Sequence, residues 1–155
     1  MELVDGATTP EENGTSFADL PPFDSSPLSG YGNGVGGVSV DGITLGDGKR
    51  ILVKDYASTD THASNNGIWE VRSGDWTRPN DWFMNNSYIS TGTLVPVGGS
   101  GEINRATQWV INKIFKNGQE DPGPITSSDD IVMFTDIAIR DLEALELRPR
   151  SEPYP

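Results

Sequence analysis

Short runs in which apolar and polar residues alternate dominate the chain between residues 38 and 134. Val38-Ser39-Val40 and Ile43-Thr44-Leu45 alternate on either side of Asp41-Gly42, a dipeptide typical of two-residue hairpin turns. Arg50–Lys54 has an apolar centre between charged ends, which predicts a short buried strand. Further strands are expected at residues 68–72, 76–78, 88–90, 93–97, 106–115 and 131–134.

Turn residues separate these expected strands at spacings of roughly 8–12 residues, as in small all-β domains. No helical pattern of about 10–15 residues lies between them, so a parallel α/β architecture is disfavoured. Trp69, Trp76 and Trp109 are large apolar anchors for a small core. The pattern therefore predicts an all-β domain at residues 38–137, either a small β-barrel or a sandwich.

The first 37 residues show no sustained period, and prolines interrupt any helix there. Eight acidic residues precede Lys49, the first basic residue of the chain. A self-repelling segment of this composition is typical of an arm rather than a domain. We therefore expect residues 1–37 to form an extended N-terminal arm, with simple disorder as the alternative.

The C-terminal end, residues 138–155, has a different pattern. Ile139, Leu142 and Leu145 recur every three residues with charged residues between them, which favours a short amphipathic helix. The prolines that follow predict a Pro-rich extended tail.

Composition narrows the classes of function. The net charge of −12 repels phosphate backbones, so a nucleic-acid partner is not expected. Such a charge also favours solubility, or a fit to a basic partner surface. The absence of cysteine excludes disulfides and thiolate metal sites. No apolar run of about 18 residues is present, and the first residues lack secretory features, so neither a membrane span nor a signal peptide is expected.

Four short motifs follow one another along the chain: V-D-G-I-T-L at residues 40–45, G-K-R-I-L-V-K at 48–54, N-G-I-W-E-V at 66–71 and W-T-R-P-N-D at 76–81. Their order resembles a β-barrel module of phage tail-fibre and other virion proteins. Weaker similarity at residues 107–111, 125–126 and 131–134 extends the resemblance over about residues 38–137. Lys49 replaces the usual Asp of that family, and the loop before Asn66 is longer.

The resemblance implies a structural component of a tailed bacteriophage virion, assembled in the bacterial host cytoplasm. A tail, baseplate or tail-fibre adaptor that acts by protein–protein docking is the first expectation. A head decoration (cement) protein of the capsid and a glycan-binding receptor module are the alternatives. The expected partners are other virion structural proteins and copies of the chain itself, in a trimer or higher ring. A host surface glycan is possible but nothing indicates one.

Apolar residues outside the expected core could dock on such partners, because arms that order on binding bury large surfaces. Trp82 and Phe83 follow the last motif, where the family tends to be polar, although completion of the core is the equal alternative. The candidate docking residues are Phe17, Leu20, Phe23, Tyr31, Trp82, Phe83, Leu142 and Leu145.

Residue types that could carry catalysis lack the context that catalysis requires. His62, the single histidine, lies in a polar loop, and no triad geometry surrounds it. Gly32-x-Gly34-x-x-Gly37 spells a dinucleotide fingerprint but precedes a strand instead of a helix. The acidic pairs Glu11-Glu12, Glu120-Asp121 and Asp129-Asp130 suit glycoside hydrolysis only if they face each other in a groove. We therefore expect no enzyme activity, no cofactor and no metal site.

Overall fold

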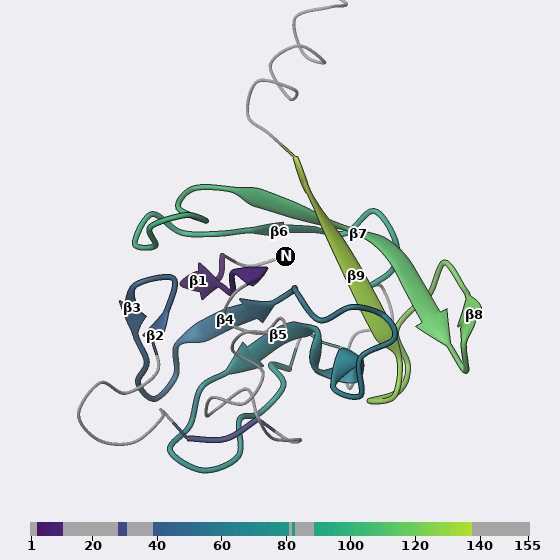
Figure 1. The fold of residues 1–155 in the computed structure, drawn as a ribbon, viewed down its shortest axis with the longest axis horizontal. Coiled ribbons are helices and arrows are strands. Elements are labelled where there is room, and N and C mark those ends of the chain that lie inside the picture. Colours follow the sequence, from purple (N-terminus) through teal and green to yellow (C-terminus); the bar gives the residue numbers. More distant parts are fainter. Residues whose placement is uncertain (1–2, 11–27, 31–38, 81, 83–88, 138–155) are drawn as a thin grey trace, which may run out of the picture.

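The computed structural model of the chain describes residues 3–10, 28–30, 39–80, 82 and 89–137, and its regular structure there is almost entirely β (Figure 1). A short 3₁₀ turn, η1 (Ala63–Asn65), precedes the strand that begins at Gly67. The all-β prediction is thus confirmed for this part of the chain. The strands are β1 (Gly6–Ala7), β2 (Ser39–Val40), β3 (Ile43–Thr44), β4 (Arg50–Val53), β5 (Gly67–Glu70), β6 (Leu94–Pro96), β7 (Gln108–Lys116), β8 (Gln119–Glu120) and β9 (Ile131–Ile137).

The described strands form three sheets, which do not close into a barrel. In the central sheet, β4 lies between β1, to which it is parallel, and β5, to which it is antiparallel. Strands β2 and β3 form a hairpin of their own. In the large sheet, β9 pairs with β7 along its whole length, so β6 and β8 must share the opposite edge of β7.

The central sheet is buried on both faces. Leu52 and Ile68 face a first core, which they share with residues of the large sheet such as Ile111. Ile51 and Val53 face a second core, which is completed by Leu28, Val40, Leu45, Tyr56, Trp69, Val71 and Trp76. Burial on both faces explains the uninterrupted apolar run of β4, because neither face of that strand meets water.

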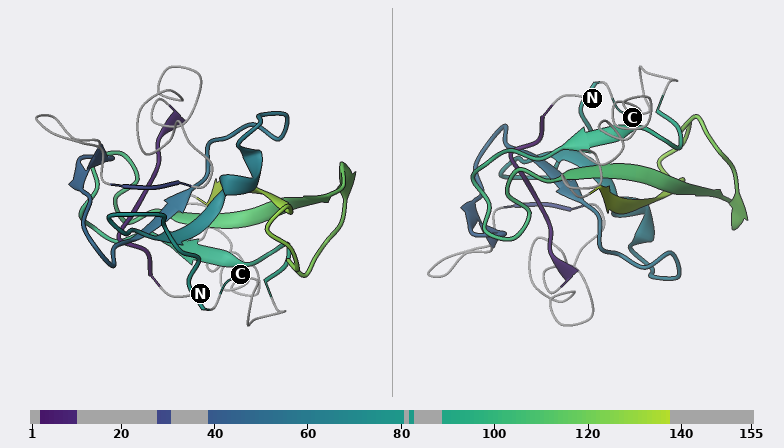
Figure 2. Two further views of the ribbon diagram at one scale, coloured as in Figure 1. Left: turned by 90° about the horizontal axis from the view of Figure 1, so that it is seen from below. Right: turned by 90° about the horizontal axis from the view of Figure 1, so that it is seen from above.

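The hairpin formed by β7 and β8 projects beyond the rest of the molecule at one end, as both views of Figure 2 show. Residues Asn117 and Gly118 form its two-residue turn with φ values of 52° and 79°. Both values are positive, as a type I′ hairpin turn requires. Strand β8 was not predicted, because Gln119 and Glu120 are exposed and carry no apolar signal.

The N-terminal arm prediction is wrong for the part of it that the structure describes. Val4 and Ala7 are fully buried in the first core, and β1 is an edge strand of the central sheet. Leu28 is fully buried in the second core. These segments are too short to show a period, yet their apolar side chains close gaps that residues 38–137 leave in both cores. The remainder of the predicted arm, and the predicted C-terminal helix and tail, lie outside the described residues.

The motif dipeptides Asp41-Gly42 and Asn66-Gly67 both suit hairpin turns, but they have different roles. Asp41-Gly42 closes the β2–β3 hairpin with φ values of 50° and 80°, as predicted. Gly67 instead begins β5 with φ of 130°, and a Cβ atom there would collide with Arg78 and Trp82. Asn66-Gly67 is therefore not a hairpin turn, and its glycine is required because a guanidinium and an indole pass close to the backbone.

Candidate functional site

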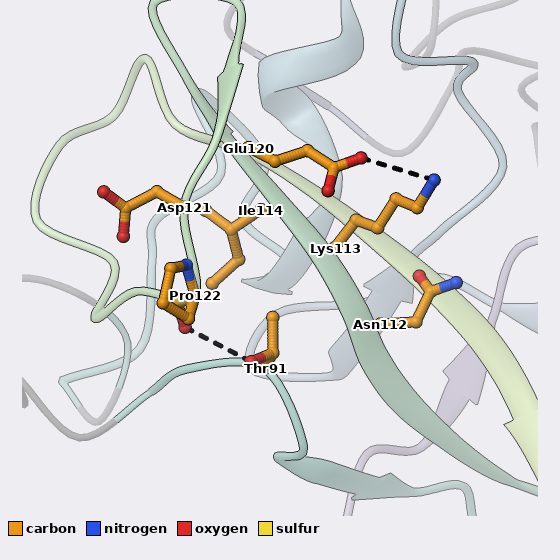
Figure 3. Close-up of a pocket in the computed structure, with 7 residues that line it drawn as sticks. All are labelled: Thr91, Asn112, Lys113, Ile114, Glu120, Asp121 and Pro122. Atoms are coloured by element: carbon orange, nitrogen blue, oxygen red, sulfur yellow. Dashed lines mark hydrogen bonds and ion pairs between the residues drawn. The ribbon is translucent and has the colours of Figure 1, made fainter.

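A polar pocket lies on the β7–β8 hairpin, where β6 and β8 diverge along one edge of β7 (Figure 3). Its volume is about 280 Å³. The residues that line the pocket come from β7, from β8 and from the loops next to β6 and β8: Thr91, Asn112, Lys113, Ile114, Glu120, Asp121 and Pro122.

A β-bulge in β7 determines which side chains reach this pocket. The register between β7 and β9 shifts between Ile111 and Lys113, which leaves Asn112 as the extra residue. Ile111 and Ile114 are both buried although they are three residues apart, and both residues between them are exposed. A regular strand would turn alternate residues inward. The bulge therefore places Asn112 and Lys113 on the outer side together, since bulges redirect side chains.

The pocket is lined by one cation, Lys113, and two carboxylates, Glu120 and Asp121. Lys113 Nζ lies 3.4 Å from Glu120 Oε1, and both side chains are more than half exposed. The hydroxyl of Thr91 donates a long bond of 3.4 Å to the Pro122 carbonyl. Figure 3 shows the carboxylate of Asp121 directed away from Lys113 and Glu120. Glu120 and Asp121 thus do not face each other as an acid and a base would.

Lys54 and Asp55, which follow β4, form an ion pair that Thr8 connects to the end of β1. Lys54 Nζ lies 3.1 Å and 3.0 Å from the two carboxylate oxygens of Asp55, and 4.0 Å from the ring centroid of Trp109. The hydroxyl of Thr8 donates to Asp55 at 3.0 Å and accepts the Lys54 backbone N–H at 3.1 Å. Burial raises the pKa of Asp55, although the charge and hydrogen bonds of Lys54 oppose the shift. The side chains of Thr8, Lys54 and Asp55 are thus hydrogen-bonded to one another. Together with Trp109 they connect β1, β4 and β7.

Arg78, from the W-T-R motif, is half-buried and bound to groups of the protein itself. Its guanidinium lies 3.9 Å from the ring centroid of Trp69 and 5.1 Å from that of Trp82. It donates to the backbone carbonyls of Ile68, Ser64 and Asn66 at 3.0, 3.0 and 3.2 Å. Burial lowers its pKa to about 9. Arginine suits this position because its planar fork of donors both stacks on aromatic rings and spans several acceptors.

Asp130 and Asp41 both have structural roles. Asp130 accepts the backbone N–H groups of Thr126 and Ser127 and lies 2.7 Å from Lys116 Nζ, which closes the loop before β9. Asp41 accepts the N–H groups of Ile103 and Asn104 at 2.8 Å and 2.7 Å. The expectation that Asp129-Asp130 belongs to a turn before a strand is confirmed.

His62 is half-buried in its loop and is not fully exposed. Its Nδ1 atom lies 3.6 Å from an Asp60 carboxylate oxygen and 3.5 Å from the Thr61 hydroxyl, and its ring stands 5.9 Å from that of Tyr56. In the described ranges, no three His, Asp or Glu side chains gather as a metal site would require. None of the helices there is long and apolar enough to cross a membrane.

Trp82 is the one candidate docking residue that lies in the described part of the chain. Its side chain is 1% exposed and belongs to the first core, so its assignment as an exposed docking residue is wrong. The core alternative applies because its indole covers Gly67 and lies next to Arg78. The other docking candidates, the Gly32–Gly37 fingerprint and Glu11-Glu12 all lie outside the described residues.

The exposed large apolar side chains of the described residues were not among the sequence predictions. They are Leu3, Leu94 and Ile103, which are 60%, 40% and 67% exposed. Leu94 belongs to β6, whereas Leu3 precedes β1 and Ile103 lies in the loop before β7. Single exposed apolar residues are common on protein surfaces, so they define no patch by themselves.

Comparison of the chain with protein-family models, with curated proteins and with solved structures found no match.

Proposed function

We propose that the chain is a structural component of a tailed bacteriophage virion, an adaptor of the tail, baseplate or tail fibre that acts by protein–protein docking. The observation that carries the proposal is the use of the motif residues. Asp41 holds a loop, Gly67 makes room for Arg78, and Arg78 bridges three carbonyls. Each of these residues maintains the scaffold, as the resemblance to a structural module leads us to expect.

The charge of the molecule supports docking as the mode of action. The chain carries a net charge of −12, and two of its cations, the buried Lys54 and the half-buried Arg78, are engaged within the fold. The excess negative charge is therefore available to meet basic surfaces of neighbouring subunits, since complementary charge guides association and register. The segments with the candidate residues Phe17, Leu20 and Leu142 would add apolar contacts in such an assembly.

Immunogold labelling of intact particles with antibodies against the full chain tests this proposal. Label at the tail tip or baseplate is the expected result. Label over the head would replace the adaptor with a head decoration protein. Antibody absorbed with the purified protein is the control for specific labelling.

Mass spectrometry of purified particles complements the labelling, because an epitope can be covered in the assembly. If the chain is absent from the particles, the virion assignment fails. Sedimentation of the purified protein tests the proposed homo-oligomer, for which we expect a mass of at least three times 16.7 kDa. A monomer at all concentrations would contradict the trimer or higher ring.

A further inference from the structure

We propose that the pocket on the β7–β8 hairpin binds one neutral sugar residue of a carbohydrate ligand. The proposal rests on the pocket alone and goes beyond the proposed role in the virion. It begins from the bulge in β7, which places the side chains of Asn112 and Lys113 together on the outer side of the strand. Bulges that re-aim side chains in this way are over-represented next to functional sites.

The pocket offers both donors and acceptors. The Lys113 ammonium donates, the Glu120 carboxylate accepts, and the Asn112 amide and Thr91 hydroxyl can do both. A sugar ring carries neighbouring hydroxyl groups, each of which can donate and accept a hydrogen bond. These hydroxyls can therefore pair with both the donors and the acceptors of the pocket. Pro122, which is exposed, adds apolar surface against which the C–H groups of a ring can pack.

Charge and size favour a neutral ligand of one ring. Lys113 and Glu120 compensate each other at 3.4 Å, and the carboxylate of Asp121 points elsewhere, where it accepts the Gly123 N–H at 2.9 Å. A cation or an anion would have to compete with the existing ion pair. The volume of about 280 Å³ is at the small end of ligand pockets. It fits a monosaccharide unit better than an oligosaccharide.

Nuclear magnetic resonance titration of the isotope-labelled full chain tests the proposal. The probes are the methyl glycosides of glucose, galactose, N-acetylglucosamine and rhamnose, each added to about 50 mM, well above the Kd of about 1–10 mM expected for so open a pocket. At least one of them should shift the amide signals of Asn112, Lys113 and Glu120 in a saturable way, while signals of the central sheet stay unchanged.

Two variants examine the assigned groups. Asn112→Ala removes the side chain that the bulge directs outward, and Glu120→Gln keeps the shape of its side chain while removing the charge. Each should weaken binding about tenfold, because Asn112→Ala removes a hydrogen-bonding group and Glu120→Gln replaces a charged acceptor with a weaker neutral one. Gln119→Ala is the matched control, since Gln119 is exposed on the same hairpin and does not line the pocket. It should bind as tightly as the unaltered chain.

Two further probes distinguish other ligand classes. Saturable shifts at the same amides with N-acetylarginine amide, and none with sugars, would make the pocket a site for a basic side chain. The same result with inorganic phosphate would make it an anion site. Either result overturns the proposal, as would sugar-dependent shifts that persist in both Asn112→Ala and Glu120→Gln. The result is independent of where immunogold places the chain on the particle, so the two proposals can fail separately.

Discussion

The guanidinium of Arg78 shows how one residue of a recognisable motif serves the fold. It stacks on Trp69, approaches Trp82 and donates to three carbonyls of residues 64–68. These carbonyls precede or begin β5, so the side chain fixes the entry of the chain into the central sheet. The W-T-R-P-N-D motif also suggests that Arg78 pairs with Asp81 across a turn, but Asp81 lies outside the described residues.

Substitution of Arg78 by lysine should destabilise the protein by about 2–4 kcal/mol, because an ammonium cannot stack on an indole and span three acceptors. Urea unfolding followed by tryptophan fluorescence measures the change. Arg72→Lys is the control, since Arg72 is 38% exposed and pairs with Glu70 near the surface. It should change the free energy of unfolding by less than about 1 kcal/mol. Equal effects of the two substitutions would refute the role given to Arg78.

Asp41 has a positive φ in its turn and also a buried carboxylate. Asp41→Asn keeps the turn conformation and changes only the carboxylate. Asparagine tolerates the positive φ of 50°, but it cannot accept with both oxygens from Ile103 and Asn104. We expect a loss of about 1–3 kcal/mol and faster hydrogen exchange of those two amides. Asp47→Asn, in an exposed turn, serves as the comparison. Unchanged exchange at Ile103 and Asn104 would show that the turn alone matters.

At the scale of elements, β1 is the part of the fold that the sequence least revealed. Val4 is fully buried and forms a bridge to Val97, whereas the adjacent Leu3 is 60% exposed. Asn104 donates to the carbonyls of Ala7 and Thr8, which secures β1 from a loop far along the chain. A two-residue strand has no recognisable periodicity, so the acidic residues around β1 led to the prediction of an arm.

The neighbours Leu3 and Val4 provide a test of β1. Val4→Ala should destabilise the protein by about 1–3 kcal/mol, because it leaves a cavity in the first core. Leu3→Ala should have an effect within about 0.5 kcal/mol. Thermal unfolding followed by circular dichroism compares the two variants. If both are neutral, residues 3–10 are an arm after all and do not contribute to the core.

Longer strands were predictable where the pattern was strong. The β2–β3 hairpin, β4, β5, β6, β7 and β9 were all expected within a few residues of their bounds. The predicted strand at 88–90 is wrong for Ile89 and Ser90, and only an isolated bridge at Thr77 represents the strand predicted at 76–78. The burial of β4 was predicted from its apolar run, but the elements that cover its two faces were not, because they come from distant parts of the chain.

The pocket could be predicted only in part. Glu120-Asp121 was noted as an acidic pair, and both residues line the pocket. The contribution of Asn112 was missed, because residues 106–115 were interpreted as one regular strand. In the sequence, the bulge appears only as two apolar residues, Ile111 and Ile114, that lie three positions apart. This spacing is equally typical of a helix. The direction of Asp121 depends on a loop that no sequence pattern specifies.

At the scale of the whole molecule, acidic and basic residues number 23 and 11, so the response to acid depends on how the carboxylates are held. For Asp130, burial favours a higher pKa, but the bonds from Lys116, Thr126 and Ser127 together bring the pKa below its ordinary value of 3.8. Asp55 has the opposite shift, because its burial outweighs Lys54. A lowered carboxylate pKa stabilises the fold above the ordinary value, and that stability disappears as pH falls through the folded-state value.

Asp130→Asn should therefore reduce the free energy of unfolding by about 1–3 kcal/mol near neutral pH, where the carboxylate is fully ionised. The difference from the unaltered chain should diminish as pH falls below about 3.8. Urea unfolding across this pH range measures both effects. Asp129→Asn is the neighbouring control, because Asp129 is exposed. A difference that stays constant with pH would show that Asp130 does not act through its charge.

The parallel pairing of β1 with β4 has a consequence for synthesis on the ribosome. Strand β1 has no partner until residues 51 and 52 have followed it, and the amide of Asn104 that secures it comes later still. The large sheet that covers the first core is complete only when residues 131–137 have been made. Such non-local closure gives a high contact order and slow folding. Nascent chains stalled before residue 131 should therefore remain sensitive to protease, even though most of the strands have already been translated.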